Sequence, residues 1–206
     1  MSELSIACIV VGPLQTNCYV VLNEDTREAL ITDPGANGDF IVKAIDDKGY
    51  TPKAILITHG HFDHVTGMPE VRDHYGIPVY MNGDDEDGMN RNPYIKNPDI
   101  KLLDTDIRLK GGEKLSLAGI DIEVIPCPGH TVGGVSYYIP ELKSLLAGDT
   151  LFYHSWGRTD FPGGSEDALM ATIWNNLLPL PEDTKVYPGH GRPTTIGEER
   201  KVHRYQ

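Results

Sequence analysis

The sequence contains little cysteine, and the few cysteines form no framework. The three of them, Cys8, Cys18 and Cys127, are scattered through 206 residues, and no two form a C-x-x-C pair. An odd and scattered set is typical of free thiols in a reducing compartment, not of a disulfide-rich secreted domain. We therefore expect a protein without disulfide bridges that works in the cytoplasm.

Basic residues are also in deficit. The chain has 18 Lys and Arg residues against 30 Asp and Glu residues, a formal net charge of −12, and no cluster of Lys and Arg. A nucleic-acid-binding protein usually presents a basic face. An acidic surface favours solubility and offers nothing to an anionic membrane. We expect neither a nucleic-acid nor a membrane partner.

Long hydrophobic runs are missing as well. No apolar stretch reaches the ~18 residues that a membrane-spanning helix needs. The first residues, MSELSIACIVVGPLQTN, lack the basic region and the full apolar region of a signal peptide. Apolar residues nevertheless make up 39% of the chain, which is enough for a folded core. We predict one domain over residues 1–206.

Hydrophobic periodicity predicts a protein in which strands dominate early and helices lie between and after them. Strand patterns occupy residues 4–11, 18–22, 29–32, 54–57, 78–80, 107–126, 134–139, 144–147 and 185–187. Helical patterns occupy residues 38–48, 65–75 and 165–178, and another helix starts in a capping box at residue 195. This order indicates an α/β or α+β sandwich. Residues 82–100 are polar and weakly periodic, which predicts a loop or short helical excursion, either a lid or a plain surface loop.

The stretch THGHFDH, residues 58–64, places four titratable side chains at the end of a predicted buried strand. In an extended segment His59 and His61 point the same way, so they can bind one ion side by side. Asp63 and His64 follow a turn and point elsewhere, toward a second ion. Burying these polar groups without a partner would cost several kcal/mol or more, so the cluster indicates a metal site.

Three further strand ends carry the same kinds of residue after a glycine-containing turn. They are His130 in VIPCPGHT, Asp149 in LLAGDT and His190 in VYPGH. Histidine and carboxylate together suit Zn²⁺, and also iron or manganese. His130 would complete the first site and His190 the second, while the two oxygens of Asp149 could bridge both ions.

Other histidines and cysteines have simpler interpretations. We expect His74 and His203 to be surface or core residues, His154 to be structural, and Cys127, at a strand end, to be a packed and inert thiol.

Taken in order, these motifs resemble the metallo-β-lactamase superfamily, and within it the glyoxalase II-like branch. The resemblance rests on TDPG (32–35), THGHFDH (58–64), PGHT (128–131), GDT (148–150) and PGHG (188–191). GRTDFPGG (157–164) and PGHGRPTTIGEE (188–199) resemble the short single-domain YcbL-type hydrolases.

The resemblance implies a four-layer αββα sandwich with metal ions at one edge. It implies one ion on His59, His61 and His130, a second on Asp63, His64 and His190, and Asp149 between them. It also places Asp33 behind the ligands, although the sequence alone would make Asp33 a turn former before proline.

Departures from the family patterns narrow the function. Asp149 stands at the position where true zinc β-lactamases carry a cysteine, so hydrolysis of β-lactam antibiotics becomes less expected. His61 stands where flavodiiron-type relatives carry Glu, so diiron redox chemistry also becomes less expected. Few residues follow His190, so we expect the helical C-terminal domain of typical glyoxalase II to be absent. Arg158 matches a basic residue that contacts the glutathione part of the substrate in glyoxalase II, and the alternative is an ion pair with Asp160.

The expected activity is hydrolysis of a small-molecule thioester of the S-lactoylglutathione kind. Two divalent ions, zinc with iron or manganese as alternatives, would share a water and lower its pKa toward ~7, giving a bridging hydroxide that Asp63 orients. GRTDF (157–161) also resembles the persulfide dioxygenase branch, and this resemblance implies a second hypothesis, an oxygenase with one iron on His59, His130 and Asp149. A third is a non-catalytic metal-binding domain. The sequence leaves the substrate, the metal and the oligomeric state open.

Overall fold

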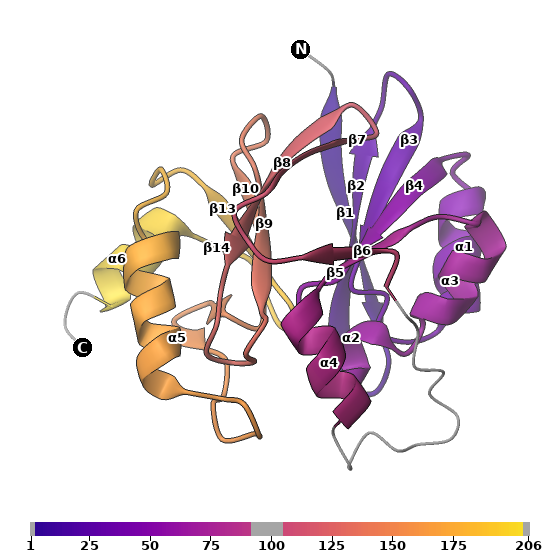
Figure 1. Cartoon of the computed structure of the whole chain (residues 1–206). Helices are drawn as coiled ribbons and strands as arrows, with labels where there is room; N and C mark the ends of the chain where they lie inside the picture. Colours follow the sequence, from indigo (N-terminus) through magenta and orange to yellow (C-terminus); the bar gives the residue numbers. More distant parts are fainter. Residues whose placement is uncertain (1–2, 92–104, 204–206) are drawn as a thin grey trace.

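The computed structural model describes residues 3–91 and 105–203, which form four layers (Figure 1). Two six-stranded sheets pack face to face, and helices cover the outer face of each sheet. The helices α1 (Gly38–Asp46) and α3 (Met68–Tyr75) lie outside the first sheet, and α5 (Glu166–Thr172) and α6 (Ile196–His203) lie outside the second. The predicted αββα sandwich is confirmed.

The first sheet holds the N-terminal strands in their sequence order. These are β1 (Leu4–Val11), β2 (Thr16–Asn23), β3 (Glu28–Thr32), β4 (Thr51–Leu56), β5 (Val79–Asn82) and β6 (Ile107–Leu109). The strands β1, β2 and β3 pair antiparallel, whereas β3, β4, β5 and β6 pair parallel. Parallel pairing brings the carboxyl ends of β3 and β4 to one edge of the sheet, where the first metal-type residues follow.

The second sheet has the order β14-β13-β10-β9-β8-β7. Its strands are β7 (Lys114–Leu117), β8 (Ile120–Pro126), β9 (Val135–Ile139), β10 (Ser144–Gly148), β13 (Lys185–Pro188) and β14 (Thr194–Thr195). A two-stranded ribbon, β11 (Leu151–Phe152) with β12 (Ser155–Trp156), follows β10. The pair β10 and β13 is parallel, so these two strands also end at a common edge.

Three hydrophobic clusters fill the spaces between the four layers. Alternation along β2 explains how one strand serves two of them: Cys18 and Val20 face the cluster under α1 and α3, while Tyr19 and Val21 face the cluster between the sheets. Every residue of β2 is buried because both of its faces are covered.

The helix predicted at 65–75 begins later, at Met68, and a separate short helix precedes it. The structure has α2 (Phe62–Val65) and then α3, with Gly67 between them. A Cβ atom at Gly67 would lie 2.9 Å from backbone atoms of Pro34 and Ala36, so the chain passes too close to the loop after β3 for a larger residue. The sequence pattern carries no sign of this long-range contact.

The polar segment 82–100 begins with a helix, α4 (Gly83–Arg91), and its remaining residues lie outside the described ranges. The predicted helix at 165–178 is confirmed: Ser165 caps α5 by accepting a hydrogen bond from the Ala168 N–H, and the helix continues as a π-helical turn, η2 (Ile173–Leu177). The capping prediction at Thr195 also holds, since its hydroxyl accepts a hydrogen bond from the Glu198 N–H at 3.2 Å.

The two sheets are joined at the edge where these strands end. The Tyr137 hydroxyl of β9 donates to the Ile57 carbonyl at 2.7 Å, and the Val135 N–H donates to the Thr58 carbonyl at 2.8 Å. On the other side, the Asn17 N–H donates to the Gly189 carbonyl at 2.7 Å. These bonds fix the loops after β4, β8 and β13 relative to one another.

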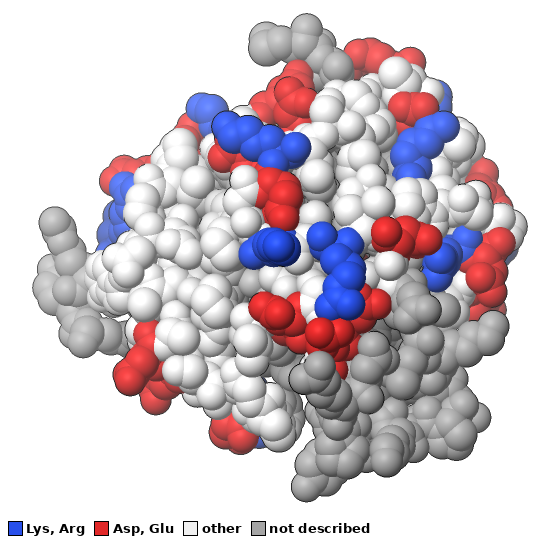
Figure 2. All heavy atoms as spheres, viewed as in Figure 1, with Lys and Arg blue, Asp and Glu red and all other residues white. Residues whose placement is uncertain are grey.

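Charges of both signs are mixed on the surface. On the face shown in Figure 2, Lys and Arg side chains lie beside Asp and Glu side chains and form no continuous basic area among the residues described. Within the same residues, no helix is long and apolar enough to span a membrane.

Candidate metal centre

The loops that follow four strands converge at one edge of the sandwich and bring the predicted ligands together. Residues 59–64 follow β4, His130 follows β8, Asp149 follows β10 directly and His190 follows β13. Their ligand atoms form groups within 4.8 Å of one another, one with His59, His61 and His130 and one with Asp63, His64 and His190. These are the two triads that the sequence predicts.

The first group consists of three imidazoles. His130 Nε2 lies 2.8 Å from His61 Nδ1, and His59 Nε2 lies 3.1 Å from the same atom. Burial and the neighbouring histidines lower the pKa of His59 well below its usual value. Burial, followed by His130 and His64, lowers the pKa of His61 to about 4. Neutral imidazoles present lone pairs, so this group has the chemistry of a metal ligand set.

The second group contains two imidazoles and a carboxylate. Asp63 Oδ2 lies 3.1 Å from His190 Nε2 and 3.6 Å from His64 Nε2. Burial alone would raise the pKa of Asp63, but the hydrogen bond from His190 and the positive charges of His64 and His190 lower it to about 2. The carboxylate is therefore ionised at neutral pH.

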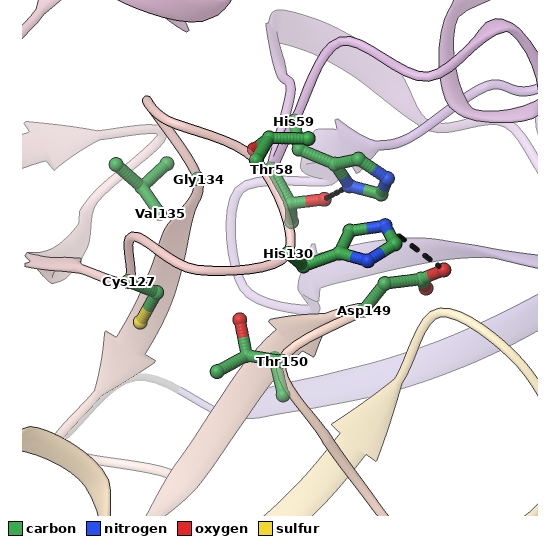
Figure 3. Close-up of a pocket in the computed structure, with 10 residues that line it drawn as sticks. Thr58, His59, Cys127, His130, Gly134, Val135, Asp149 and Thr150 are labelled. Carbon is green, nitrogen blue, oxygen red and sulfur yellow. Dashed lines mark hydrogen bonds and ion pairs between the residues drawn. The ribbon is translucent and has the colours of Figure 1, made fainter. Parts of the chain in front are cut away.

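Asp149 lies between the two groups and contacts both. Its Oδ2 atom is 3.7 Å from His130 Nε2 and 3.6 Å from His190 Nε2, and its Oδ1 atom is 3.4 Å from His64 Nε2. Figure 3 shows the Asp149 carboxylate facing the imidazole of His130. One carboxylate thus reaches a member of each triad.

Two buried atoms in the cluster test whether a metal fits it. His64 Nε2 and Asp149 Oδ1 are both buried and lie 3.4 Å apart, and neither atom makes a well-formed hydrogen bond. Unsatisfied buried polar atoms are costly and call for an explanation, and a cation between them would supply one. Close above them, a Cβ at Gly189 would lie only 2.2 Å from Asp149 Oδ1, so glycine leaves the space open. The residues fit divalent metal ions.

Asp33, whose role came only from the family resemblance, lies directly behind His64. Its Oδ2 atom accepts hydrogen bonds from His64 Nδ1 at 2.9 Å and from the Thr58 hydroxyl at 2.6 Å, and its Oδ1 atom accepts the Thr58 N–H at 2.8 Å. Gly35 brings this loop close, because a Cβ there would overlap the Asp63 carbonyl oxygen at 1.6 Å. The outer nitrogen of His64 is thereby engaged and Nε2 faces the cluster.

The other imidazoles with Nε2 in the cluster are oriented in the same way from behind. His130 Nδ1 donates to the Arg158 carbonyl at 2.7 Å, and His190 Nδ1 donates to the Leu14 carbonyl at 3.1 Å. His59 Nδ1 lies 3.1 Å from the Thr58 hydroxyl oxygen, whose proton goes to Asp33. Hydrogen bonds of this kind fix the tautomer and ring orientation of metal-binding histidines.

The Arg158 side chain makes the ion pair that was the alternative to a substrate contact. Its guanidinium donates two 2.6 Å hydrogen bonds to the Asp160 carboxylate and lies 4.0 Å above the ring of Phe161. The Phe161 ring lies 5.5 Å from that of His61. The Arg158 side chain is also exposed to solvent. Substrate binding by Arg158 stays a prediction.

The residues with simpler interpretations lie away from the cluster. His74 pairs with Asp46 at 3.3 Å on the surface, buried His203 lies 3.4 Å from Glu199, and His154 Nε2 lies 2.9 Å from Glu198.

Cys127 is fully buried beneath the cluster, and its sulfur points away from His130 and Asp149 (Figure 3). It lies 3.1 Å from the Ser136 hydroxyl, and burial raises the pKa of the thiol to about 11. This environment agrees with the expected inert thiol.

Sequence analysis does not predict two residues that contact the cluster or its loops. The Thr16 hydroxyl donates to Asp63 Oδ2 at 3.1 Å. The buried carboxylate of Asp85, in α4, accepts the N–H groups of Gly60 and Gly133 at 2.8 and 2.6 Å. Thr16 has no distinguishing motif, and Asp85 lies in a segment whose many acidic residues look like a solvated surface.

Comparison with known proteins agrees with this geometry. The chain matches the sequence model of the metallo-beta-lactamase superfamily over residues 11–190. It is 37% identical over 195 residues to the probable metallo-hydrolase YqgX of Bacillus subtilis, covering 92% of each chain. It is 32% identical over 204 residues to the hydroxyacylglutathione hydrolase GloC of Haemophilus influenzae, covering 96% of each.

Solved structures show the same fold at similar identity. The B3 metallo-beta-lactamase BLEG-1 superposes with a TM-score of 0.89 at 39% identity, covering 96% of this chain and 97% of BLEG-1. TTHA1623 in a di-iron-bound form superposes with a TM-score of 0.84 at 33% identity, covering 97% of this chain and all of the other. The fold, the converging ligand residues and these relatives agree, and the chain belongs to the metallo-beta-lactamase superfamily.

Proposed function

We propose that this metallo-hydrolase is a thioester hydrolase of the glyoxalase II type that uses two divalent metal ions. One ion would be held by His59, His61 and His130 and the other by Asp63, His64 and His190. The observation that carries the proposal is the position of Asp149, whose two oxygens face His64 on one side and His130 and His190 on the other. A carboxylate shared in this way supports a pair of ions.

Two ions bound at these triads would supply an activated water and would polarise the carbonyl oxygen of the substrate. We expect zinc, and the same donors also suit iron or manganese. The likeness to TTHA1623, which binds two irons, is compatible with an iron pair here.

Asp63 is the residue that we assign to orient the attacking water. The Thr16 hydroxyl donates a hydrogen bond to its Oδ2 atom, which helps to fix the carboxylate in place. An ionised carboxylate at this position can accept a hydrogen bond from the attacking water and so orient it. A thiolate leaving group needs little protonation because its pKa is about 8.5, which favours a thioester over an amide.

Two observations support the proposed substrate class: the name of one relative and the surroundings of His61. GloC is named as a hydroxyacylglutathione hydrolase. In this chain Phe161 offers an apolar face beside His61, and Arg158 offers a charge that an acidic thiol carrier could contact. An acyl thioester of an acidic thiol such as glutathione therefore fits the site.

A mononuclear iron oxygenase is the second candidate. Its ligands would be His59, His130 and Asp149, and the 3.7 Å separation of His130 Nε2 from Asp149 Oδ2 is compatible with this set as well as with the two-ion site. That arrangement gives no role to the second triad, of Asp63, His64 and His190. A non-catalytic metal-binding domain is the third candidate, and it predicts no turnover at all.

The test is a panel of substrates with the purified full chain. We expect turnover of S-lactoylglutathione, little turnover of a β-lactam, and no oxygen uptake with glutathione persulfide. Asp149→Ala should reduce thioester turnover at least about a hundredfold with an unchanged circular dichroism spectrum. The matched control is Asp121→Ala, an exposed aspartate of β8. Full activity of the Asp149 variant, or oxygen uptake without hydrolysis, would contradict the proposal.

A further inference from the structure

The helix α4 places one carboxylate between the two loops that carry the three-histidine group. The Asp85 side chain, 5% exposed, points inward from α4. Its Oδ2 atom accepts the Gly60 N–H at 2.8 Å, and its Oδ1 atom accepts the Gly133 N–H at 2.6 Å. Each oxygen thus holds a different loop.

The two bonded glycines stand next to the candidate ligands. Gly60 lies between His59 and His61, so its N–H position sets the path of the chain that carries both imidazoles. Gly133 lies three residues after His130, in the loop closed by the hydrogen bond from the Cys127 N–H to the Gly134 carbonyl at 2.7 Å. A shift at either glycine would move one part of the triad relative to the other.

There is little space in which this contact could be replaced. A Cβ at Gly133 would lie 2.7 Å from the Asp85 backbone nitrogen and 2.7 Å from Asn82 Oδ1, so the loop packs directly on the start of α4. Both glycine N–H groups depend on the same buried side chain. An ionised carboxylate accepts both with short, charge-assisted bonds, whereas an amide has only one accepting atom.

We propose that Asp85 is a positioning residue that sets the separation between the His59 and His61 pair and His130, and thereby the metal affinity of the three-histidine group. The inference rests on the proposed two-ion function, because it assigns Asp85 to one ion and not the other. Asp85 contacts Gly60, which lies between two ligands of the first triad, and Gly133, which follows the third, while the second triad has Asp33 behind His64.

The same helix contains a matched control. Glu86 is equally buried, with 5% exposure, and its carboxylate also accepts two hydrogen bonds, from the Thr105 N–H at 2.8 Å and the Thr105 hydroxyl at 2.7 Å. These bonds connect α4 to the segment before β6. Glu86→Gln therefore perturbs the packing of α4 to a similar degree without touching a ligand loop.

The experiment measures metal binding and not activity. Wild type, Asp85→Asn and Glu86→Gln are stripped with a chelator and titrated with Zn²⁺ against a chromophoric competitor, and Co²⁺ absorption spectra report the geometry of each ion. A His190→Ala background, which disables the second triad, identifies the binding event that belongs to the three histidines. Thermal unfolding of the stripped proteins records any general loss of stability.

We expect Asp85→Asn to weaken the three-histidine event by about 10- to 100-fold and to leave the other event unchanged. Glu86→Gln should leave both events unchanged. Equal binding by Asp85→Asn and wild type, or an equal loss in Glu86→Gln, would overturn the inference. If Asp85→Asn does not fold, Asp85→Glu retains both acceptor oxygens at a shifted position, and wild-type affinity in that variant would likewise overturn it.

A failure of the two-ion function gives a different result. A wild-type protein that binds a single ion would contradict the proposed function. The Zn²⁺ affinity of the three-histidine group could still be compared between wild type and Asp85→Asn, and that comparison would still test the role of Asp85.

Discussion

Asp33 Oδ2 accepts a hydrogen bond from His64 Nδ1 at 2.9 Å, and both side chains are almost completely buried. The same carboxylate accepts two bonds from Thr58, the residue before His59. Asp33 therefore connects the second triad, through His64, with the start of the segment that carries the first. Its backbone lies in the left-handed region, at φ 50°, a conformation that aspartate tolerates better than most residues.

Replacing Asp33 with Asn should weaken metal binding at the second triad. Three donors converge on Asp33, and an amide with one accepting oxygen cannot satisfy all of them. We expect a loss of about 10- to 100-fold in affinity, measured by competition with a chelator. The exposed Asp47→Asn variant is the control, and unchanged affinity at Asp33→Asn would show that His64 does not need this partner.

A substitution at Arg158 tests whether this side chain contacts the substrate or only forms a surface ion pair. If the guanidinium contacts the acidic part of the substrate, Arg158→Ala should raise KM roughly tenfold with little change in kcat, because a ground-state contact is lost. Asp160→Ala, which removes the partner of the ion pair, should not raise KM. Steady-state kinetics with S-lactoylglutathione give the KM of both variants. An unchanged KM in Arg158→Ala would show that Arg158 forms the ion pair and does not contact the substrate.

Cys127 should be unreactive although it lies next to the centre. With a pKa of about 11, only about one thiol in ten thousand is ionised at pH 7, and the side chain is fully buried. A thiol reagent should therefore modify exposed Cys8 in the folded protein, and Cys127 and Cys18 only after unfolding. Cys127→Ala should retain hydrolysis. Rapid modification of Cys127 together with loss of activity would contradict this expectation.

Glu199 should stabilise the fold in a pH-dependent manner. Burial alone would raise its pKa, but hydrogen bonds from His203 and Thr194 outweigh burial and lower it. Because the folded state favours the ionised form, this contribution is complete above the unfolded pKa of about 4.3 and is lost as the pH falls through the lower folded pKa.

Glu199→Gln should therefore reduce the free energy of unfolding by about 1–3 kcal/mol at pH 7 and by less near pH 3. Urea unfolding of the chelator-treated protein measures the difference. Glu198→Gln, a partly exposed neighbour, is the control, and a deficit that grows toward pH 3 would contradict the assignment.

The sequence predicts the fold, and which side chains come together at the edge of the sandwich, because these signals are local. Alternation in the strands, and a glycine turn before each of His130, Asp149 and His190, are readable within a few residues. The confirmed sandwich follows from the order of those strands. Asp33 could be placed only through the family resemblance, since an aspartate before proline is an ordinary turn residue.

The remaining features depend on contacts that no local pattern encodes. The carbonyl groups of Leu14 and Arg158 orient His190 and His130, and a backbone carbonyl carries no sequence signature. Asp85 acts through glycine N–H groups that are 25 and 48 positions away in the chain. The close approach of Gly67 to Pro34 and Ala36 likewise joins segments that lie far apart in the sequence.

The most direct test of the central claim is the metal content of the protein, measured by elemental analysis after purification without chelators. A pair of triads bridged by Asp149 predicts two divalent ions per chain, zinc in our expectation, and loss of one ion in His190→Ala. One iron per chain, unaffected by His190→Ala, would contradict the two-ion hydrolase and favour the oxygenase.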